Sequence, residues 1–86
     1  MRLDLLLKQS GLIKRRVIAK QFCEKGLVLL NGKVGKPSSE VKDGDSITVT
    51  LGKKVVTCDI RFEVTGKKTT IHVIANDVHD DGDLDA

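Results

Sequence analysis

The spacing of the apolar residues changes once along this chain of 86 residues, at Gly26. Before Gly26 they recur every three or four positions, which is the spacing of one helical face. After it they alternate with polar residues, as in a half-buried strand. Because neither spacing suits the other kind of element, the sequence predicts two helices followed by a small sheet, an α+β fold.

Two short helices are predicted in the N-terminal part. In the stretch RLDLLLKQSG, Leu3, Leu6 and Leu7 share one helical face. The stretch KRRVIAKQFCEKG predicts a second helix with an apolar stripe. The stripe consists of Ile18, Ala19, Phe22 and Cys23. Arg15 does not fit this pattern, because it projects onto the apolar face if the helix begins at Lys14.

The rest of the chain predicts a mostly antiparallel sheet against which the two helices pack. Asn31-Gly32 lies within the run LVLLNGKVGK and is a strong hairpin signal, because both turn residues tolerate a positive φ. Pro37 lies in a connector, and Asp43-Gly44 marks a second turn. Three alternating segments follow, SITVTLG, KKVVTCDIRFEV and TTIHVIA.

We expect one domain, residues 1–75, followed by an acidic tail, residues 76–86. A chain of this length is sufficient for one domain with a modest core. The final stretch DVHDDGDLDA contains five Asp among ten residues and no Lys or Arg. Such a composition buries too little apolar surface to order itself, so the tail is predicted to be disordered.

The cysteines and the hydropathy favour a soluble cytoplasmic protein. Cys23 and Cys58 are far apart, and each lies within an apolar run, so we expect two buried, reduced thiols. No apolar run approaches the roughly 18–20 residues that span a bilayer. The N-terminus also lacks the apolar core of a signal peptide.

The charge is distributed unevenly. Residues 1–36 contain nine Lys or Arg and two Asp or Glu, a net charge of +7, whereas residues 37–86 contain six and ten, a net charge of −4. A basic N-terminal half predicts an anionic macromolecular partner for that half.

An enzyme is not expected. The histidines, His72 in a predicted strand and His79 in the tail, are not spaced to activate a nucleophile. The acidic tail does not match a calcium loop, because the bidentate acid at the twelfth position would lie beyond Ala86. No glycine-rich nucleotide-binding motif is present, so we expect no catalytic residue, no metal site and no cofactor.

The second helix is the strongest candidate for a binding site. Lys14, Arg15, Arg16 and Lys20 lie at or near its start, where unpaired backbone N–H groups also attract phosphate oxygens. Arginine can grip phosphate with two donors or stack on an unpaired base. Charge alone leaves two interpretations open, a nucleic-acid-binding surface or a solvated basic helix.

From Met1 to about Ile60 the chain also resembles the RNA-binding domain named after small-subunit ribosomal protein S4. The resemblance rests on RLD in the first helix, RR..A in the second, G.V..NGK at the hairpin and K.S..V..GD.I.V after it. Among these proteins the chain is most similar to the small free-standing bacterial RqcP group, and next to the S4-type small heat-shock protein. Both groups bind stalled large ribosomal subunits that carry peptidyl-tRNA.

The resemblance implies a non-catalytic protein that binds rRNA, and tRNA with it, on the large ribosomal subunit in ribosome-associated quality control. The implied protein partner is an RqcH-like tailing factor, and we expect a monomer that contacts no membrane and no small-molecule substrate. Asp4 is implied to orient a neighbouring arginine. The charge pattern and the resemblance together give the candidate RNA-binding residues Arg2, Lys8, Lys14, Arg15, Arg16, Lys20, Asn31, Gly32, Lys33 and Lys36.

Three alternatives are kept. A ribosome-assembly or heat-shock S4-type protein would use the same surface. The run LLNGKVGKPSSEVKDGDSITV also resembles β-grasp sulfur carriers, but those need a C-terminal Gly-Gly where this sequence has GDLDA, and they do not begin with two basic helices. A domain appended to an RNA-modifying enzyme or a synthetase is disfavoured by Met1 at the start of the motif and by the lack of a catalytic segment.

Overall fold

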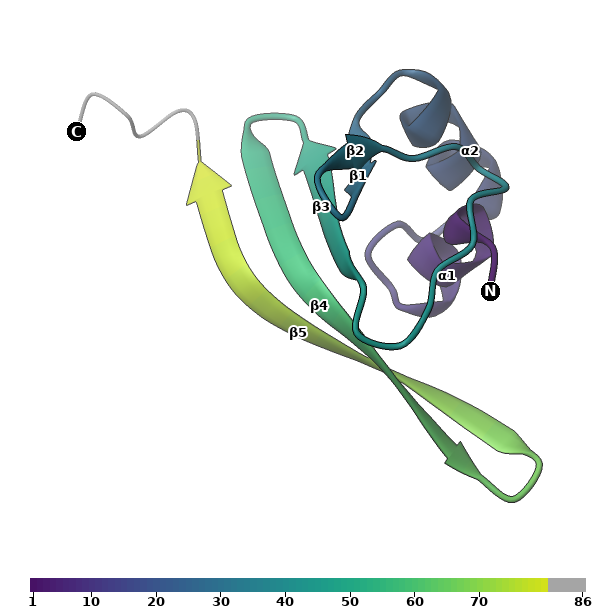
Figure 1. Cartoon of the computed structure of the whole chain (residues 1–86). Coiled ribbons are helices and arrows are strands. Elements are labelled where there is room, and N and C mark those ends of the chain that lie inside the picture. Colours follow the sequence, from purple (N-terminus) through teal and green to yellow (C-terminus); the bar gives the residue numbers. More distant parts are fainter. Residues whose placement is uncertain (81–86) are drawn as a thin grey trace.

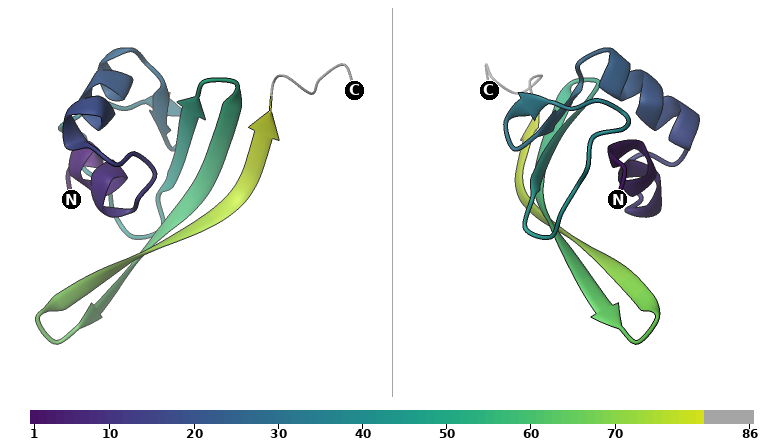
Figure 2. Two further views of the ribbon diagram at one scale, coloured as in Figure 1. Left: turned by 180° about the vertical axis from the view of Figure 1, so that it is seen from behind. Right: turned by 45° about the vertical axis from the view of Figure 1, so that its right-hand side comes forward.

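Two helices precede five strands along the chain, and both helices cover one face of the sheet (Figures 1 and 2). The structure is a computed structural model, and it describes residues 1–80. The elements are α1 (Leu3–Gln9), α2 (Arg16–Glu24), β1 (Val28–Leu30), β2 (Lys33–Val34), β3 (Ser46–Leu51), β4 (Lys54–Thr65) and β5 (Lys68–Asp80). The predicted α+β architecture is confirmed.

The second helix begins two residues later than the sequence predicts. Arg15 precedes α2 with extended backbone angles, φ −120° and ψ 132°, and its side chain is exposed. Its position on the apolar face was therefore an artefact of starting the helix at Lys14. Ala19 and Cys23, one turn apart, are buried, but Ile18 is 38% exposed, so the predicted core stripe was too wide at this residue.

The predicted hairpin forms at Asn31-Gly32. Both residues have a positive φ, 52° and 84°, and β1 pairs antiparallel with β2. The Asn31 side chain also connects the turn to the next strand. Its Oδ1 accepts a hydrogen bond from the Ser46 backbone N–H (2.9 Å), and its Nδ2 donates to Asp45 (3.2 Å). Asn31 thus has a structural role in the turn.

After β2 the chain passes directly over the start of α1. A Cβ atom on Gly35 would collide with the Leu3 side chain, which is fully buried. Two residues further on, the Pro37 carbonyl accepts a hydrogen bond from the Asp4 backbone N–H (3.1 Å). The Ser39 carbonyl accepts one from the Leu3 N–H (2.8 Å). This connector fixes the first turn of α1 against the sheet.

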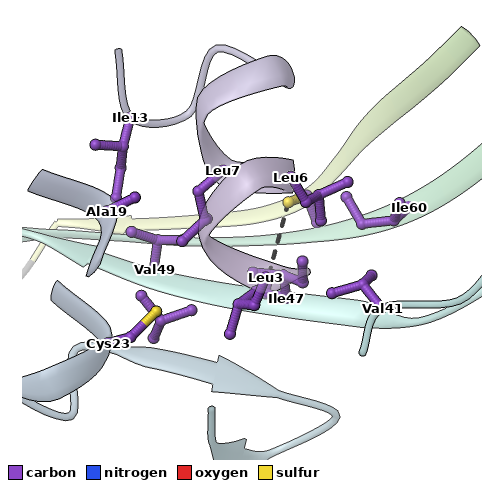
Figure 3. Packing of buried hydrophobic residues seen from close by; sticks show 12 residues of the cluster. Leu3, Leu6, Leu7, Ile13, Ala19, Cys23, Val41, Ile47, Val49 and Ile60 are labelled. Carbon is purple, nitrogen blue, oxygen red and sulfur yellow. Dashed lines mark hydrogen bonds between the residues drawn. The ribbon is translucent and has the colours of Figure 1, made fainter. Parts of the chain in front are cut away.

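The five strands form one antiparallel sheet in the order β2-β1-β3-β4-β5. Its covered face and the helices enclose an aliphatic core (Figure 3). The core residues are Leu3, Leu6, Leu7, Ile13, Ala19, Cys23, Val28, Val41, Ile47, Val49, Cys58 and Ile60. The Cys58 thiol donates to the Ile47 carbonyl at 3.6 Å.

Strands β4 and β5 continue well beyond this core as a twisted two-stranded ribbon (Figure 1). Ile60 is the last fully buried residue of β4, and no side chain of residues 61–75 is fully buried. We call residues 61–72 the arm. The arm accounts for the elongated shape of the described chain, whose principal extents are 49 × 24 × 22 Å.

Strand β5 also extends past the boundary that we placed at residue 75. Its backbone pairs with β4 as far as Asp80, opposite Lys54, after a bulge near Thr57 and Cys58. Residues 76–80 therefore belong to the sheet and not to a tail. The difference arises because strand pairing depends on the backbone. The N–H and C=O groups along the edge of β4 can form hydrogen bonds with a strand of any side-chain composition. The rest of the predicted tail, residues 81–86, lies outside the described residues.

Candidate RNA-binding surface

A buried carboxylate organises the basic surface. Asp4 lies in the first turn of α1 and is only 1% exposed. Its Oδ1 accepts hydrogen bonds from the Leu5 backbone N–H (2.7 Å) and from Nε of Arg2 (3.2 Å). Its Oδ2 accepts one from Nη2 of Arg2 (3.3 Å) and lies 3.4 Å from Nε of Arg16. One carboxylate thus holds two arginines, one directly before α1 and one at the start of α2.

The surroundings of Asp4 keep it ionised. Burial acting alone would raise its pKa. The hydrogen bonds from Arg2 and Leu5 and the positive charges of Arg16 and Arg2 oppose burial and outweigh it, so the pKa of Asp4 lies below its ordinary value of 3.8. At neutral pH the two guanidinium groups therefore face a full negative charge.

The arginines keep donors free for a ligand. Arg2 faces Asp4 with one edge of its guanidinium group, formed by Nε and Nη2, and Arg16 faces it with Nε. Each side chain remains about half exposed, at 48% and 47%. A guanidinium group has five N–H donors, so those not directed at Asp4 can bind phosphate oxygens.

Around this pair lies a shallow recess of about 370 Å³ between α1 and α2. Arg2, Asp4, Arg16, Val17 and Lys20 line it. Three cations thus surround one carboxylate, and the recess is electropositive. Val17 was not among the binding residues predicted from the sequence, but it lines the recess and is 66% exposed. Its position directly after Arg16, outside the apolar stripe, was the available signal.

Other predicted residues border the recess. Lys14 and Arg15 are exposed in the segment leading into α2, whose first turn has no side-chain cap. The N–H groups of that turn can therefore donate to an anion. Lys36 is exposed and adjoins Pro37, whose carbonyl accepts the hydrogen bond from the Asp4 N–H. The basic surface thus extends to both sides of Arg2 and Arg16.

The remaining predicted residues do not line this recess. Lys8 lies in the last turn of α1, and Lys33 lies on the edge strand β2. Asn31 uses its side chain within the fold, whereas Gly32 supplies the turn conformation. The sequence correctly placed Asn31, Gly32 and Lys33 at a hairpin, but none of them lines the recess.

The two cysteines are suited to packing. Burial, followed by the nearby charges of Asp4 and Glu24, raises the pKa of Cys23 to about 11. Burial, with a smaller effect of Asp59, also raises the pKa of Cys58. Both thiols are free and stay protonated at neutral pH, so neither is a reactive nucleophile.

Two helices on an antiparallel sheet, with cations gathered where the helices meet, agree with the S4 domain that the sequence resembles. The family model described as "S4 domain" matches residues 1–47, which include both helices and the hairpin. This class of protein agrees with the sequence prediction of a binding module rather than an enzyme, and it excludes the sulfur-carrier alternative.

Relatives identify the chain more closely. It is 46% identical over 71 residues to the RQC P-site tRNA stabilizing factor of Halalkalibacterium halodurans, covering 83% of this chain and 76% of the relative. It is 49% identical over 69 residues to the factor of the same name from Listeria innocua, covering 79% and 75%. For the Bacillus subtilis factor the values are 50% over 60 residues, with 70% of each chain covered. The chain belongs to the RQC P-site tRNA stabilizing factor family.

A solved structure supports the fold. Heat shock protein 15 of Vibrio cholerae, described as trimeric, is similar with a TM-score of 0.70 and 28% identity, over 85% of this chain and 80% of that one. Among residues 1–80, neither helix has the length and apolar character needed to cross a membrane.

Proposed function

We propose that this protein binds the large ribosomal subunit through the α1–α2 surface and stabilises a tRNA in its P site during ribosome-associated quality control. The names of the relatives describe those proteins as RQC factors that stabilise a P-site tRNA. The observation that carries the proposal is the arrangement of Arg2 and Arg16 around the buried Asp4, because it presents two oriented guanidinium groups on an electropositive recess.

The mechanism is binding without chemistry. Arg2, Arg16 and Lys20 contact phosphates of folded RNA, while Lys14, Arg15 and Lys36 extend the contact to either side. Pre-orientation by Asp4 lowers the entropy that the arginines lose on binding. The bound protein then holds rRNA and tRNA together while a second factor, of the RqcH kind, extends the stalled chain.

The proposal includes three further expectations. We infer that the protein acts as a monomer on each subunit, that it works in the cytoplasm where large subunits are found, and that an RqcH-like factor binds next to it. The proposed role and the names of the relatives support the site of action and the neighbouring factor, whereas the monomer is our own inference and differs from the trimer described for heat shock protein 15.

Sucrose-gradient sedimentation of the tagged protein in lysate tests the proposal. We expect co-migration with free large subunits that carry peptidyl-tRNA, and loss of co-migration for Arg16→Ala. Lys25→Ala is the matched control, because Lys25 is an exposed cation directly after the same helix and lies outside the recess. Sedimentation of the wild type away from large subunits, or equal loss for both variants, would contradict the proposal.

A second candidate function is that of an S4-type heat-shock protein, which the structural similarity to heat shock protein 15 favours. The two functions differ in when the protein is needed. If its association with large subunits rises only after heat shock and does not depend on the tailing factor, the heat-shock function is correct.

A further inference from the structure

Most of the arm lies beyond the core, although Phe62 and Ile71 at its base are half-buried against it. Beyond Ile60, β4 continues for five residues to Thr65, which adds about 17 Å at the usual rise of a strand. None of the side chains along this length is fully buried. The S4 domain match ends at residue 47, before β4 begins. The arm therefore lies outside the matched domain and projects from the body of the molecule.

The end of the arm has a simple composition. We call residues 65–70, Thr-Gly-Lys-Lys-Thr-Thr, the arm tip, and all six are exposed. The arm tip contains two lysines, three hydroxyl groups and no acidic residue. The one acid of the arm, Glu63, is engaged by the ring of His72 at 2.7 Å. The arm tip thus presents only cations and hydrogen-bonding groups.

This composition favours RNA over protein as a partner. Protein interfaces depend on buried aromatic, methionine and arginine anchors, and lysine is depleted there. The arm tip has none of those anchors. Lysine, threonine hydroxyl and backbone N–H groups are common ligands of nucleic-acid phosphates.

We propose that the arm tip is a second RNA-binding surface, which contacts phosphates of the same ribosomal complex that the α1–α2 surface binds. This inference rests on the proposed function. Lys67 and Lys68 supply the charge, and the antiparallel pairing of β4 with β5 holds them at the end of the ribbon. Because both surfaces belong to one folded chain, binding at the first raises the effective concentration of the second.

The chain provides an unusually close control. The turn between β3 and β4 has the sequence Leu-Gly-Lys-Lys, and the arm turn has Thr-Gly-Lys-Lys. Their glycines have similar positive φ values, 65° at Gly52 and 61° at Gly66. The two turns lie at opposite ends of β4. Identical substitutions in both turns therefore change charge and composition equally but at different places.

The test measures binding of the labelled full-length protein to purified large ribosomal subunits, with and without deacylated tRNA in the P site. The arm variant is Lys67→Ser with Lys68→Thr, and the control variant is Lys53→Ser with Lys54→Thr. We expect the arm variant to weaken binding at least about fivefold at 0.1 M salt, the equivalent of one lost phosphate contact. The control variant should bind like the wild type.

The outcomes distinguish a failure of the arm-tip inference from a failure of the proposed function. Equal losses of affinity in both variants would mean that only the net charge of the protein matters. Unchanged affinity of the arm variant would mean that the arm tip does not contact RNA. Either result overturns the inference. A loss that needs tRNA identifies tRNA phosphates, and a loss without tRNA identifies rRNA phosphates. If Arg16→Ala also binds like the wild type, the proposed function fails as well.

A charge-conserving variant guards against misfolding. Lys67→Arg with Lys68→Arg should retain wild-type affinity, because phosphate contacts tolerate the exchange of one cation for the other. Weak binding of this folded variant would overturn the inference.

Discussion

Asp4 is the residue at which the fold and the binding surface depend on each other. It is buried, as a core residue is, yet its partners are two half-exposed arginines, one directly before α1 and one at the start of α2. The RLD motif predicted an orienting role for Asp4 towards one arginine. The second partner, Arg16, could not be predicted, because the contact depends on how α2 crosses α1, and the sequence pattern does not contain that angle.

We predict that Asp4→Asn lowers the free energy of unfolding by about 1.5–3 kcal/mol, the usual range for hydrogen bonds to charged groups. The amide can still accept a hydrogen bond from the Leu5 N–H but no longer attracts the guanidinium groups. RNA affinity should also fall severalfold, because Arg2 and Arg16 lose their fixed orientation. Urea unfolding and RNA titration check both effects, with Glu24→Gln, an exposed carboxylate on α2, as the control. Unchanged stability would show that the carboxylate charge is not needed.

The lowered pKa of Asp4 gives a pH dependence of defined sign. A carboxyl group whose pKa is lower in the folded state stabilises that state above its unfolded pKa and loses this effect as the pH falls through the folded value. The stability difference between wild type and Asp4→Asn should therefore be constant near neutral pH and shrink below about pH 4. Urea midpoints across this range measure it. A difference that persists unchanged at pH 2 would point to packing rather than charge.

At the scale of the elements, the sequence predicted what depends on local chemistry. The Asn31-Gly32 turn, the two-turn first helix and the alternation of β3 and β4 all follow from backbone preferences and spacing. The start of α2 and the exposure of Ile18 could not be predicted from the sequence. No capping side chain marks the start of α2, and the burial of a side chain depends on the element that packs against it.

The connector after β2 shows a constraint that spacing cannot reveal. We predict that Gly35→Ala lowers stability by about 1–3 kcal/mol, because the added methyl group forces the buried Leu3 side chain to move in a filled core. The exposed Ser38→Ala should have little effect and serves as the control. Thermal unfolding of both variants measures the difference. Wild-type stability of Gly35→Ala would mean that Leu3 has room to adjust.

At the scale of the whole molecule, the charge asymmetry was the most informative sequence feature, and the arm was the least predictable one. The TGKK sequence at residues 65–68 is typical of a turn, but nothing in the alternation of β4 indicates where the core ends along it. That point depends on how far the two short helices reach: Ile60 is the last fully buried residue of β4, and Phe62 beyond it is only partly buried against the core.

Binding to RNA should depend strongly on salt. If Arg2, Lys14, Arg15, Arg16 and Lys20 each contact one phosphate, these five contacts alone give a slope of log K against log salt concentration of about −3.5 to −4.5, and contacts of Lys36 or the arm tip make it steeper. Arg16→Ala should make the slope shallower by about 0.7–0.9, and the exposed neutral residue Gln21, changed to Ala, should leave it unaltered. Titrations at several salt concentrations between about 50 and 200 mM measure this slope. A slope near zero would show that phosphate contacts do not drive binding.

The position of β5 at the edge of the sheet affects how the purified protein behaves in storage. From Thr69 to Ala75 this strand contains no Lys, Arg, Asp, Glu or Pro, the residues that normally protect an open edge from pairing with another chain. Concentrated samples without RNA should therefore form larger particles on standing. A lysine in place of Ile74, which is 50% exposed, should keep them monodisperse in light scattering. A wild type that stays monodisperse under the same conditions would show that the edge is already shielded.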